Sequence, residues 1–228
     1  MIIISFLDTG KHVFSQPERE LIREVATANE HSVRRLLPQL INRIELTVKA
    51  GSITIPGISM IGATRGRKGR VICTIDPVCL QGTSATVQSQ LRPLLFHELN
   101  HVVRKQGQSR EAITQRTLLD FVVSEGLATV FERDQGGGHP PWGQYPQEVQ
   151  EWVEEMIALP ANASHQQWMF QHSDGRRWIG YKAGTYLVDR AVEAAGLSSS
   201  VDLVEVPTAK VFELASRSST VIQVPQCV

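Results

Sequence analysis

The sequence predicts an α+β fold, with a small N-terminal β-sheet and helix followed by a mostly helical half. Three observations support this class. The apolar runs that are typical of strands all lie before residue 80. Apolar residues at helical spacing dominate residues 81–228. Strands that precede the helices, instead of alternating with them, favour α+β over a doubly wound sheet.

The chain has 228 residues, of which 42% are hydrophobic and 20% charged, and this fits one globular domain spanning 1–228. We expect a sheet-containing part over 1–80 and a helical part over 81–228. The run Gly136-Gly137-Gly138-His139-Pro140-Pro141 is the strongest turn-forming stretch in the chain. It predicts a break near 135–143.

The N-terminal part is expected to contain three strands and one helix. Residues 2–7 and 71–75 are apolar runs, and residues 43–49 alternate apolar with polar side chains. Ser15, followed by Pro17 and Glu18, is a good helix start, and this helix is expected to run to about Arg35. Residues 51–70 are rich in Gly and short polar residues, which indicates a loop with room for a hairpin.

The helical part is expected to begin with the helix that carries the chemistry. Pro93 fits its first turn, where no amide hydrogen bond is lost. Arg104 and Lys105 suit the negative end of its dipole. Helices are expected near 86–105, 110–133, 145–158, 163–171 and 178–195. Residues 198–216 predict one or two short helices, with Pro207 between them.

The most informative stretch is His97-Glu98-Leu99-Asn100-His101. Residues four apart lie on one face of a helix, so both imidazoles can reach one metal ion. Glu98 then leans toward a third, open coordination position. Two neutral nitrogen ligands with a nearby base are what a zinc hydrolase needs. The alternative is two histidines on the polar flank of a surface helix, with Glu98 solvated between them.

A third ligand is needed, because a catalytic zinc site combines three protein ligands with one open position. Glu125 lies in the apolar stretch 118–131, where a buried carboxylate is costly without a partner. The competing candidate is Asp120, which is shorter and lies about 140° around the helix. Glu125 could also lie exposed on a helix edge. The short segment 106–109 is expected to bring the two helices together as neighbours.

Charge and cysteine content exclude several classes of protein. The net charge is zero, and the densest basic cluster, 65–70, is typical of a solvated turn, so we expect no nucleic-acid partner. Cys73, Cys79 and Cys227 form no C-x-x-C pair, which favours a reducing, cytoplasmic location. The apolar run 1–8 is too short for a signal sequence, and we expect no membrane span. A monomer is favoured, but the sequence leaves the oligomeric state open.

The motif and the later segment Ser124-Glu125-Gly126-Leu127-Ala128 together resemble the pattern of gluzincins, in which an H-E-x-x-H helix is followed by a ligand Glu on the next helix. More narrowly, the chain resembles a bacterial family of predicted zinc-dependent proteases. The similar segments also include 57–69, 75–77 and 179–184. The likeness covers roughly 57–190, most of the chain.

This resemblance implies a single metallopeptidase-like domain. It also implies that the strand 71–75, beside the zinc helix, holds an extended substrate. In some gluzincins the residue four positions after the ligand Glu is acidic and supports a ligand His. Here it is Thr129, so such a carboxylate must come from elsewhere, with Asp120 as one candidate, or be absent.

We therefore expect a zinc-dependent peptidase with a peptide or protein substrate. His97, His101 and Glu125 would bind Zn²⁺, and Glu98 would take a proton from water and pass it to the leaving amine. Tyr181 is the first choice for the donor that stabilises the oxyanion. Its alternative role is that of an amphipathic core residue.

Other interpretations of the same residues stay open. Tyr186 and His172 are weaker candidates for the oxyanion donor. The protein could instead hydrolyse a non-peptide amide or ester. An exposed edge strand that can pair with an extended peptide would argue against this alternative. It could also be a binding protein in which the metal only stabilises the fold. Such a closed site would need a fourth ligand, for which His172 or Cys73 is a candidate.

Overall fold

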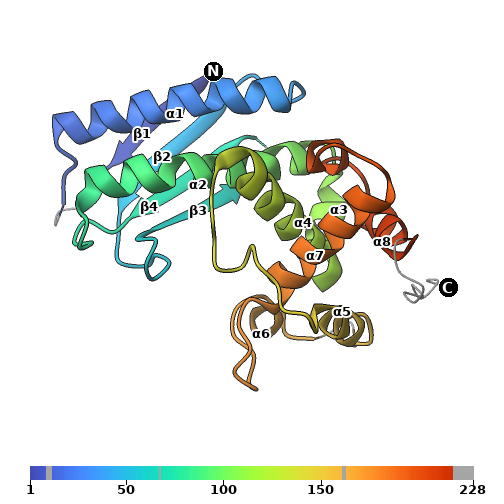
Figure 1. Ribbon diagram of the computed structural model, residues 1–228. Helices are drawn as coiled ribbons and strands as arrows, with labels where there is room; N and C mark the ends of the chain where they lie inside the picture. Colours follow the sequence, from blue (N-terminus) through green and yellow to red (C-terminus); the bar gives the residue numbers. More distant parts are fainter. Residues whose placement is uncertain (9–11, 67, 161–162, 218–228) are drawn as a thin grey trace. The chain divides into compact units, whose positions relative to one another are not determined.

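The computed structural model describes residues 1–8, 12–66, 68–160 and 163–217 (Figure 1). Cys227, and Arg67 of the basic cluster, lie outside the described residues. The chain divides into two compact units. Unit 1 comprises Met1–Gly107 and Asp134–Gly138, and unit 2 comprises Gln108–Arg133 and His139–Val228. The expectation of one domain over 1–228 stays a prediction.

Unit 1 is built on a four-stranded mixed sheet with the strand order β1-β2-β4-β3. The strands are β1 (Ile2–Leu7), β2 (Ile44–Ala50), β3 (Met60–Arg65) and β4 (Arg70–Ile75). β1, β2 and β4 are parallel, and β3 pairs antiparallel with β4 as a hairpin. The three expected strands are confirmed. Residues 51–70, expected as a loop with room for a hairpin, contain one strand, β3, whose hairpin partner is β4. The α+β class is confirmed as well.

Period-2 patterning decides which face of this sheet is covered. Ile44, Leu46 and Val48 of β2 are fully buried, whereas the residues between them are only half-buried. Two helices lie side by side on the buried face, α1 (Gln16–Leu36) over β1 and α2 (Gly82–Gln106) over β3 and β4 (Figure 1). The apolar rows of the sheet therefore form the floor on which α2 rests.

Helix α1 begins as expected at a capping box. Glu18 accepts a hydrogen bond from the backbone N–H of Ser15 at 2.7 Å. Near the other end, the Arg34 guanidinium donates to the carbonyl oxygens of Leu40 and Ile41 at 2.9 and 2.8 Å. These bonds fix the turn that leads from α1 into β2.

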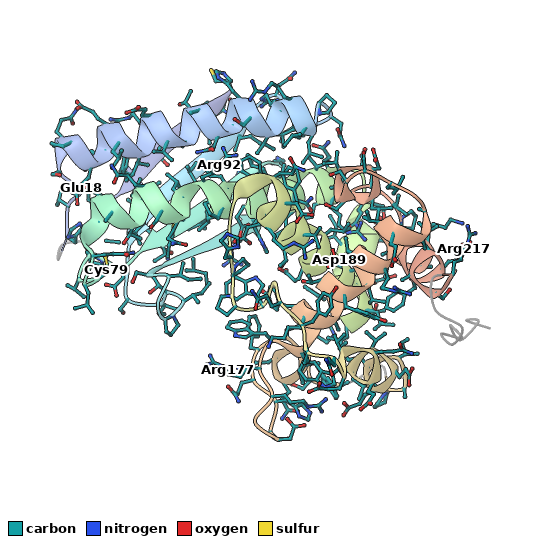
Figure 2. All side chains as sticks on the ribbon, viewed as in Figure 1. Glu18, Cys79, Arg92, Arg177, Asp189 and Arg217 are labelled. Carbon is teal, nitrogen blue, oxygen red and sulfur yellow. The ribbon has the colours of Figure 1, made fainter. Side chains whose placement is uncertain are left out.

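Helix α2 starts at Gly82, four residues earlier than expected. The expectation that Pro93 lies in the first turn is wrong, because more than two turns of helix precede it. A mid-helix proline removes one backbone hydrogen bond. Burial of the preceding turns, including Val87 and Leu91, offsets that loss. Arg92, labelled in Figure 2, donates to the carbonyl oxygens of Gln135 and Gly136 at 2.9 and 3.1 Å. These bonds hold the glycine-rich segment of unit 1 on this helix.

Unit 2 is helical. Its elements are α3 (Arg110–Thr114), α4 (Leu118–Phe131), α5 (Val149–Ile157), α6 (His165–Met169), α7 (Ile179–Ala194), η2 (Ser200–Leu203) and α8 (Thr208–Arg217), while η1 (Glu132–Gly136) follows α4. The single helix expected over 110–133 is wrong, because Thr117 caps a new helix, α4. The break at Pro207 between η2 and α8 is confirmed.

The core of unit 2 is centred on α7, which packs on α4, α5 and α8. Fully buried members of this core include Val122, Leu127, Ala183 and Leu187. Across the residues that the structure describes, no helix is both long and apolar enough to cross a membrane.

Candidate metal centre

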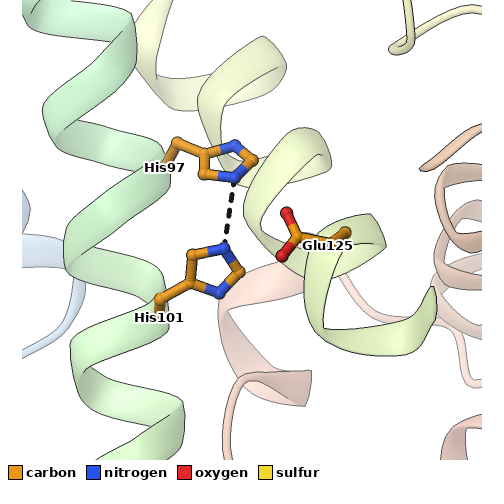
Figure 3. Close-up of side chains that lie close together, drawn as sticks. All are labelled: His97, His101 and Glu125. Carbon is orange, nitrogen blue, oxygen red and sulfur yellow. Dashed lines mark hydrogen bonds between the residues drawn. The ribbon is translucent and has the colours of Figure 1, made fainter. Parts of the chain in front are cut away.

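Helix α2 brings the two motif histidines together. Their Nε2 atoms lie 3.2 Å apart, and their rings meet edge to face with centroids 4.8 Å apart (Figure 3). In a tetrahedral zinc site with Zn–N bonds of ~2.0–2.1 Å, two nitrogen ligands lie about 3.3 Å apart. His97 is half-buried and His101 is 5% exposed. The pair therefore has the spacing of two ligands of one ion.

Glu125 lies within α4 of unit 2 and is half-buried. Ser124 and Leu127, on either side of Glu125 and Gly126, are fully buried, so the carboxylate lies on a largely buried stretch of the helix. Arg116 supplies a positive charge nearby. Burial lowers the pKa of Arg116, and the carboxylates of Asp120 and Glu125 oppose that shift.

Three side chains among the described residues form a group that could hold a metal ion: His97, His101 and Glu125 (Figure 3). Each offers one ligand atom, and these atoms lie within 4.8 Å of one another. Two imidazoles and one carboxylate are a donor set that suits zinc in a catalytic site, which keeps a position open. The residues present therefore fit the cofactor that the motif predicts.

Asp120 is not a member of this group, because its carboxylate caps helix α4. Its Oδ2 accepts hydrogen bonds from the backbone N–H and the hydroxyl of Thr117, both at 2.9 Å. Burial raises the pKa of Asp120, but hydrogen bonds from Thr208 and Thr117 outweigh it and leave the pKa below its usual value. Thr129 is fully buried.

The two residues considered as a fourth ligand also lie outside the group. Cys73 is fully buried in β4, and burial, reinforced by the charge of Glu98, raises the pKa of its thiol to about 12. His172 of unit 2 pairs instead with Asp174, with 2.9 Å between Nδ1 and Oδ2. Neither side chain offers its donor atom to this group.

Glu98, the predicted base, is 5% exposed and points from α2 onto strand β3. The hydroxyl of Thr64 donates to its Oε2 at 2.6 Å, and Gly62 lies beneath its carboxylate. Sequence reasoning missed both residues, because it treated 51–70 as a loop. Their spacing of two, typical of residues on one face of a strand, was the available signal.

The expectation that strand 71–75 holds a substrate is wrong. Those residues form β4, which pairs with β2 on one side and β3 on the other. A strand with two neighbours has no backbone groups left for a third. The edge strand next to β4 is β3. After β2, the chain forms β3 at the edge first, and the hairpin then returns to form β4 between β3 and β2.

Tyr181 lies on α7, three residues before the point where Gly184 touches the backbone of α4. Its ring packs against Trp142, Trp178 and Phe170, with centroids 5.8, 5.5 and 6.1 Å away. The side chain is half-buried and packs against the core of unit 2. The weaker candidate Tyr186 donates to Gln150 at 3.4 Å.

Three comparisons were made, with curated proteins, with solved structures and with models of protein families. No curated protein and no solved structure matches the chain. A family model described as "Predicted Zn-dependent protease (DUF2268)" matches residues 53–213, a segment that contains both motif histidines and Glu125. Because this match covers well over half of the sequence, the chain belongs to the DUF2268 family of predicted zinc-dependent proteases.

Proposed function

We propose that the protein is a gluzincin-type zinc peptidase in which His97, His101 and Glu125 bind the metal ion. The observation that carries this proposal is the 3.2 Å separation of the two histidine Nε2 atoms on one helix face. Two histidines on an ordinary surface helix need not have a carboxylate beside them, whereas here an oxygen of Glu125 lies within 4.8 Å of a nitrogen of each histidine. The family description points to the same cofactor.

Each protein group then has one task. Zinc, when bound, supplies Lewis acidity and lowers the pKa of a water molecule toward neutrality. Glu98 takes a proton from the attacking water and passes it to the leaving amine, so that its carboxylate is regenerated. Tyr181 donates a hydrogen bond to the oxyanion that develops on the substrate carbonyl.

We propose a peptide or protein as the substrate, bound in an extended conformation along β3. This strand forms an edge of the sheet and lies under α2, the helix that carries Glu98. An edge strand presents unpaired backbone groups to an added strand, which is a general mode of peptide recognition. This observation favours a peptide over a small amide or ester. The free thiols of Cys73 and Cys79 favour action in the cytoplasm.

The test is metal analysis combined with a peptide-library cleavage assay on the wild type, Glu98→Gln and Glu24→Gln. Glu24 is an exposed residue of α1 and serves as the matched control. We expect about one zinc per chain in all three proteins, since the ligands are retained. Cleavage should persist in Glu24→Gln and fall at least ~100-fold in Glu98→Gln.

Three results would count against the proposal. Full activity of Glu98→Gln would exclude this base. A wild type that binds no zinc would exclude the metal site. Cleavage of simple esters or amides, with every peptide left intact, would favour the non-peptide hydrolase.

A further inference from the structure

The carboxylate of Glu98 has one hydrogen-bond partner in the described part of the chain, the hydroxyl of Thr64. Thr64 Oγ1 lies 2.6 Å from Glu98 Oε2 and 3.0 Å from the Glu98 carbonyl oxygen. A hydrogen bond of this kind, to a charged acceptor, is shorter and stronger than one between neutral groups. The bond occupies Oε2, whereas Oε1 accepts none from the described residues.

Gly62 provides the space in which this carboxylate lies. A Cβ on Gly62 would come within 2.5 Å of Glu98 Oε1 and 2.7 Å of its Cγ, closer than real contacts allow. The backbone of Gly62 is not in the left-handed region, so the need for glycine here is one of space. Next to it in the sheet, paired with Gly62, is the neutral, buried thiol of Cys73.

Strand β3 is also fastened to α2 by its backbone. Lys105 donates from Nζ to the carbonyl oxygen of Thr64 at 3.1 Å. Lys105 and Glu98 are seven residues apart, two turns of the same helix. Thr64 is therefore held by α2 through its side chain and its main chain. An edge strand, paired on one side only, gains a fixed position from this double attachment.

We propose that Thr64 is a positioning residue for Glu98. Its hydroxyl holds Oε2 and leaves Oε1 to take the proton from water, while Gly62 leaves room for the carboxylate. The inference rests on the proposed function, because it assigns a partner to the base of that reaction. It adds that strand β3 must supply a hydroxyl at Thr64 and space at Gly62, which the zinc motif itself does not specify.

The experiment compares Thr64→Val, which removes the hydroxyl at nearly constant volume, with Thr64→Ser, which keeps it. Thr47→Val is the matched control, because Thr47 lies on the same sheet and its hydroxyl pairs with Ser5. For each zinc-loaded protein we would measure kcat and KM on a cleaved peptide, zinc content and melting temperature. A crystal structure of each would give the position of the Glu98 carboxylate.

We expect Thr64→Val to lower kcat roughly 10- to 100-fold, since small misplacements of a catalytic group have such effects. KM and zinc content should stay within about twofold, because the hydroxyl bonds to Glu98 and is neither a metal ligand nor a proposed substrate contact. Thr64→Ser should restore kcat, and Thr47→Val should match the wild type. In crystals of Thr64→Val the Glu98 carboxylate should leave its place, and in Thr64→Ser it should keep it.

An unmoved carboxylate in Thr64→Val would overturn the inference, as would equal losses of kcat in the valine and serine variants. If the melting temperature fell in both Thr64→Val and Thr64→Ser while kcat stayed unchanged, Thr64 would have a structural role only. Failure of the proposed function gives a different result, namely no peptide cleavage by the wild type. The crystallographic comparison decides the role of Thr64 in that case too.

Discussion

Gly126 of α4 and Gly184 of α7 meet backbone to backbone. A Cβ on Gly126 would lie 2.2 Å from the carbonyl carbon of Gly184, and a Cβ on Gly184 would lie 2.1 Å from the carbonyl oxygen of Val122. Each glycine costs about 1 kcal/mol of helix propensity relative to alanine. The close packing of the two helices offsets this cost. It also fixes two side chains within unit 2: Glu125, one residue before Gly126, and Tyr181, about one turn before Gly184.

Gly184→Ala should therefore lower the free energy of unfolding by about 1–2 kcal/mol, because overpacking outweighs the gain in helix propensity. Urea denaturation followed by circular dichroism measures the change. Gly143→Ala is the comparison, since its Cβ would meet Pro140 at 3.2 Å, a tight contact but about 1 Å longer than those at Gly184, and its cost should be smaller. A Gly184→Ala protein as stable as the wild type would mean that the helices separate at no cost.

Glu125→Ala should lower zinc affinity at least ~100-fold, because it removes a ligand and not merely a group supporting one. Competition with a chromophoric chelator measures the affinity. Asp120→Asn is the control from the same helix and should bind zinc as the wild type does. The opposite ranking of the two variants would make Asp120 the ligand.

Asp120→Asn should instead change stability and its dependence on pH. The pKa of Asp120 is lowered in the folded protein, so its contribution is present above the pKa of the unfolded chain. That contribution is lost as the pH falls through the folded pKa. We expect the variant to lose about 1 kcal/mol at pH 7, the usual value of a capping residue, and less at pH 3.

Urea titrations at both pH values test this expectation. Thr117→Val removes the hydroxyl that donates to Asp120 and should show the same flattened dependence on pH. An Asp120→Asn protein whose loss of stability is equal at pH 7 and pH 3 would contradict the assigned cap.

The part of the site that sequence could predict is local. The helical period alone places His97 beside His101, and the structure has their Nε2 atoms 3.2 Å apart. The role of Asp120 was also readable, because Thr117-x-x-Asp120 follows the spacing of a capping box. That role was missed, because Asp120 was weighed as a metal ligand or as the support of a ligand histidine, and not as a cap.

The rest depends on contacts between distant residues. Thr64 and Glu98 are 34 residues apart, and their hydrogen bond exists only because β3 returns beside β4 under α2. Apolar patterning predicted a strand over 71–75 but not which strands pair with it. Its pairing with β2 and β3 is what rules out a substrate there. Strand order is set by non-local pairing, which periodicity does not encode.

Tyr181→Phe should lower kcat roughly 10- to 100-fold while zinc content stays the same, because one oxyanion donor is lost. Steady-state kinetics on a peptide found by library screening measures it. Tyr186→Phe is the control, since its hydroxyl bonds to Gln150. If Tyr181→Phe keeps full kcat, Tyr181 belongs to the aromatic cluster alone and the oxyanion donor is another group.

Gly62→Ala tests the packing of strand β3 against the base without any assay of activity. The added Cβ would lie 2.5 Å from Glu98 Oε1, so the variant should lose about 2–3 kcal/mol of unfolding free energy. In a Glu98→Ala background the obstructing atoms are gone, and the same substitution should cost less than about 1 kcal/mol. Urea denaturation of the four proteins gives this coupling energy directly.

Gly51→Ala supplies the matched cycle, because its Cβ would approach Thr74 at 2.9 Å and not Glu98. Its cost should be equal in both backgrounds. A zero coupling energy between Gly62 and Glu98 would mean that the carboxylate does not lie on β3 in solution. Since Thr64 can hold Oε2 only while the carboxylate lies there, the same result would remove the physical basis for its positioning role.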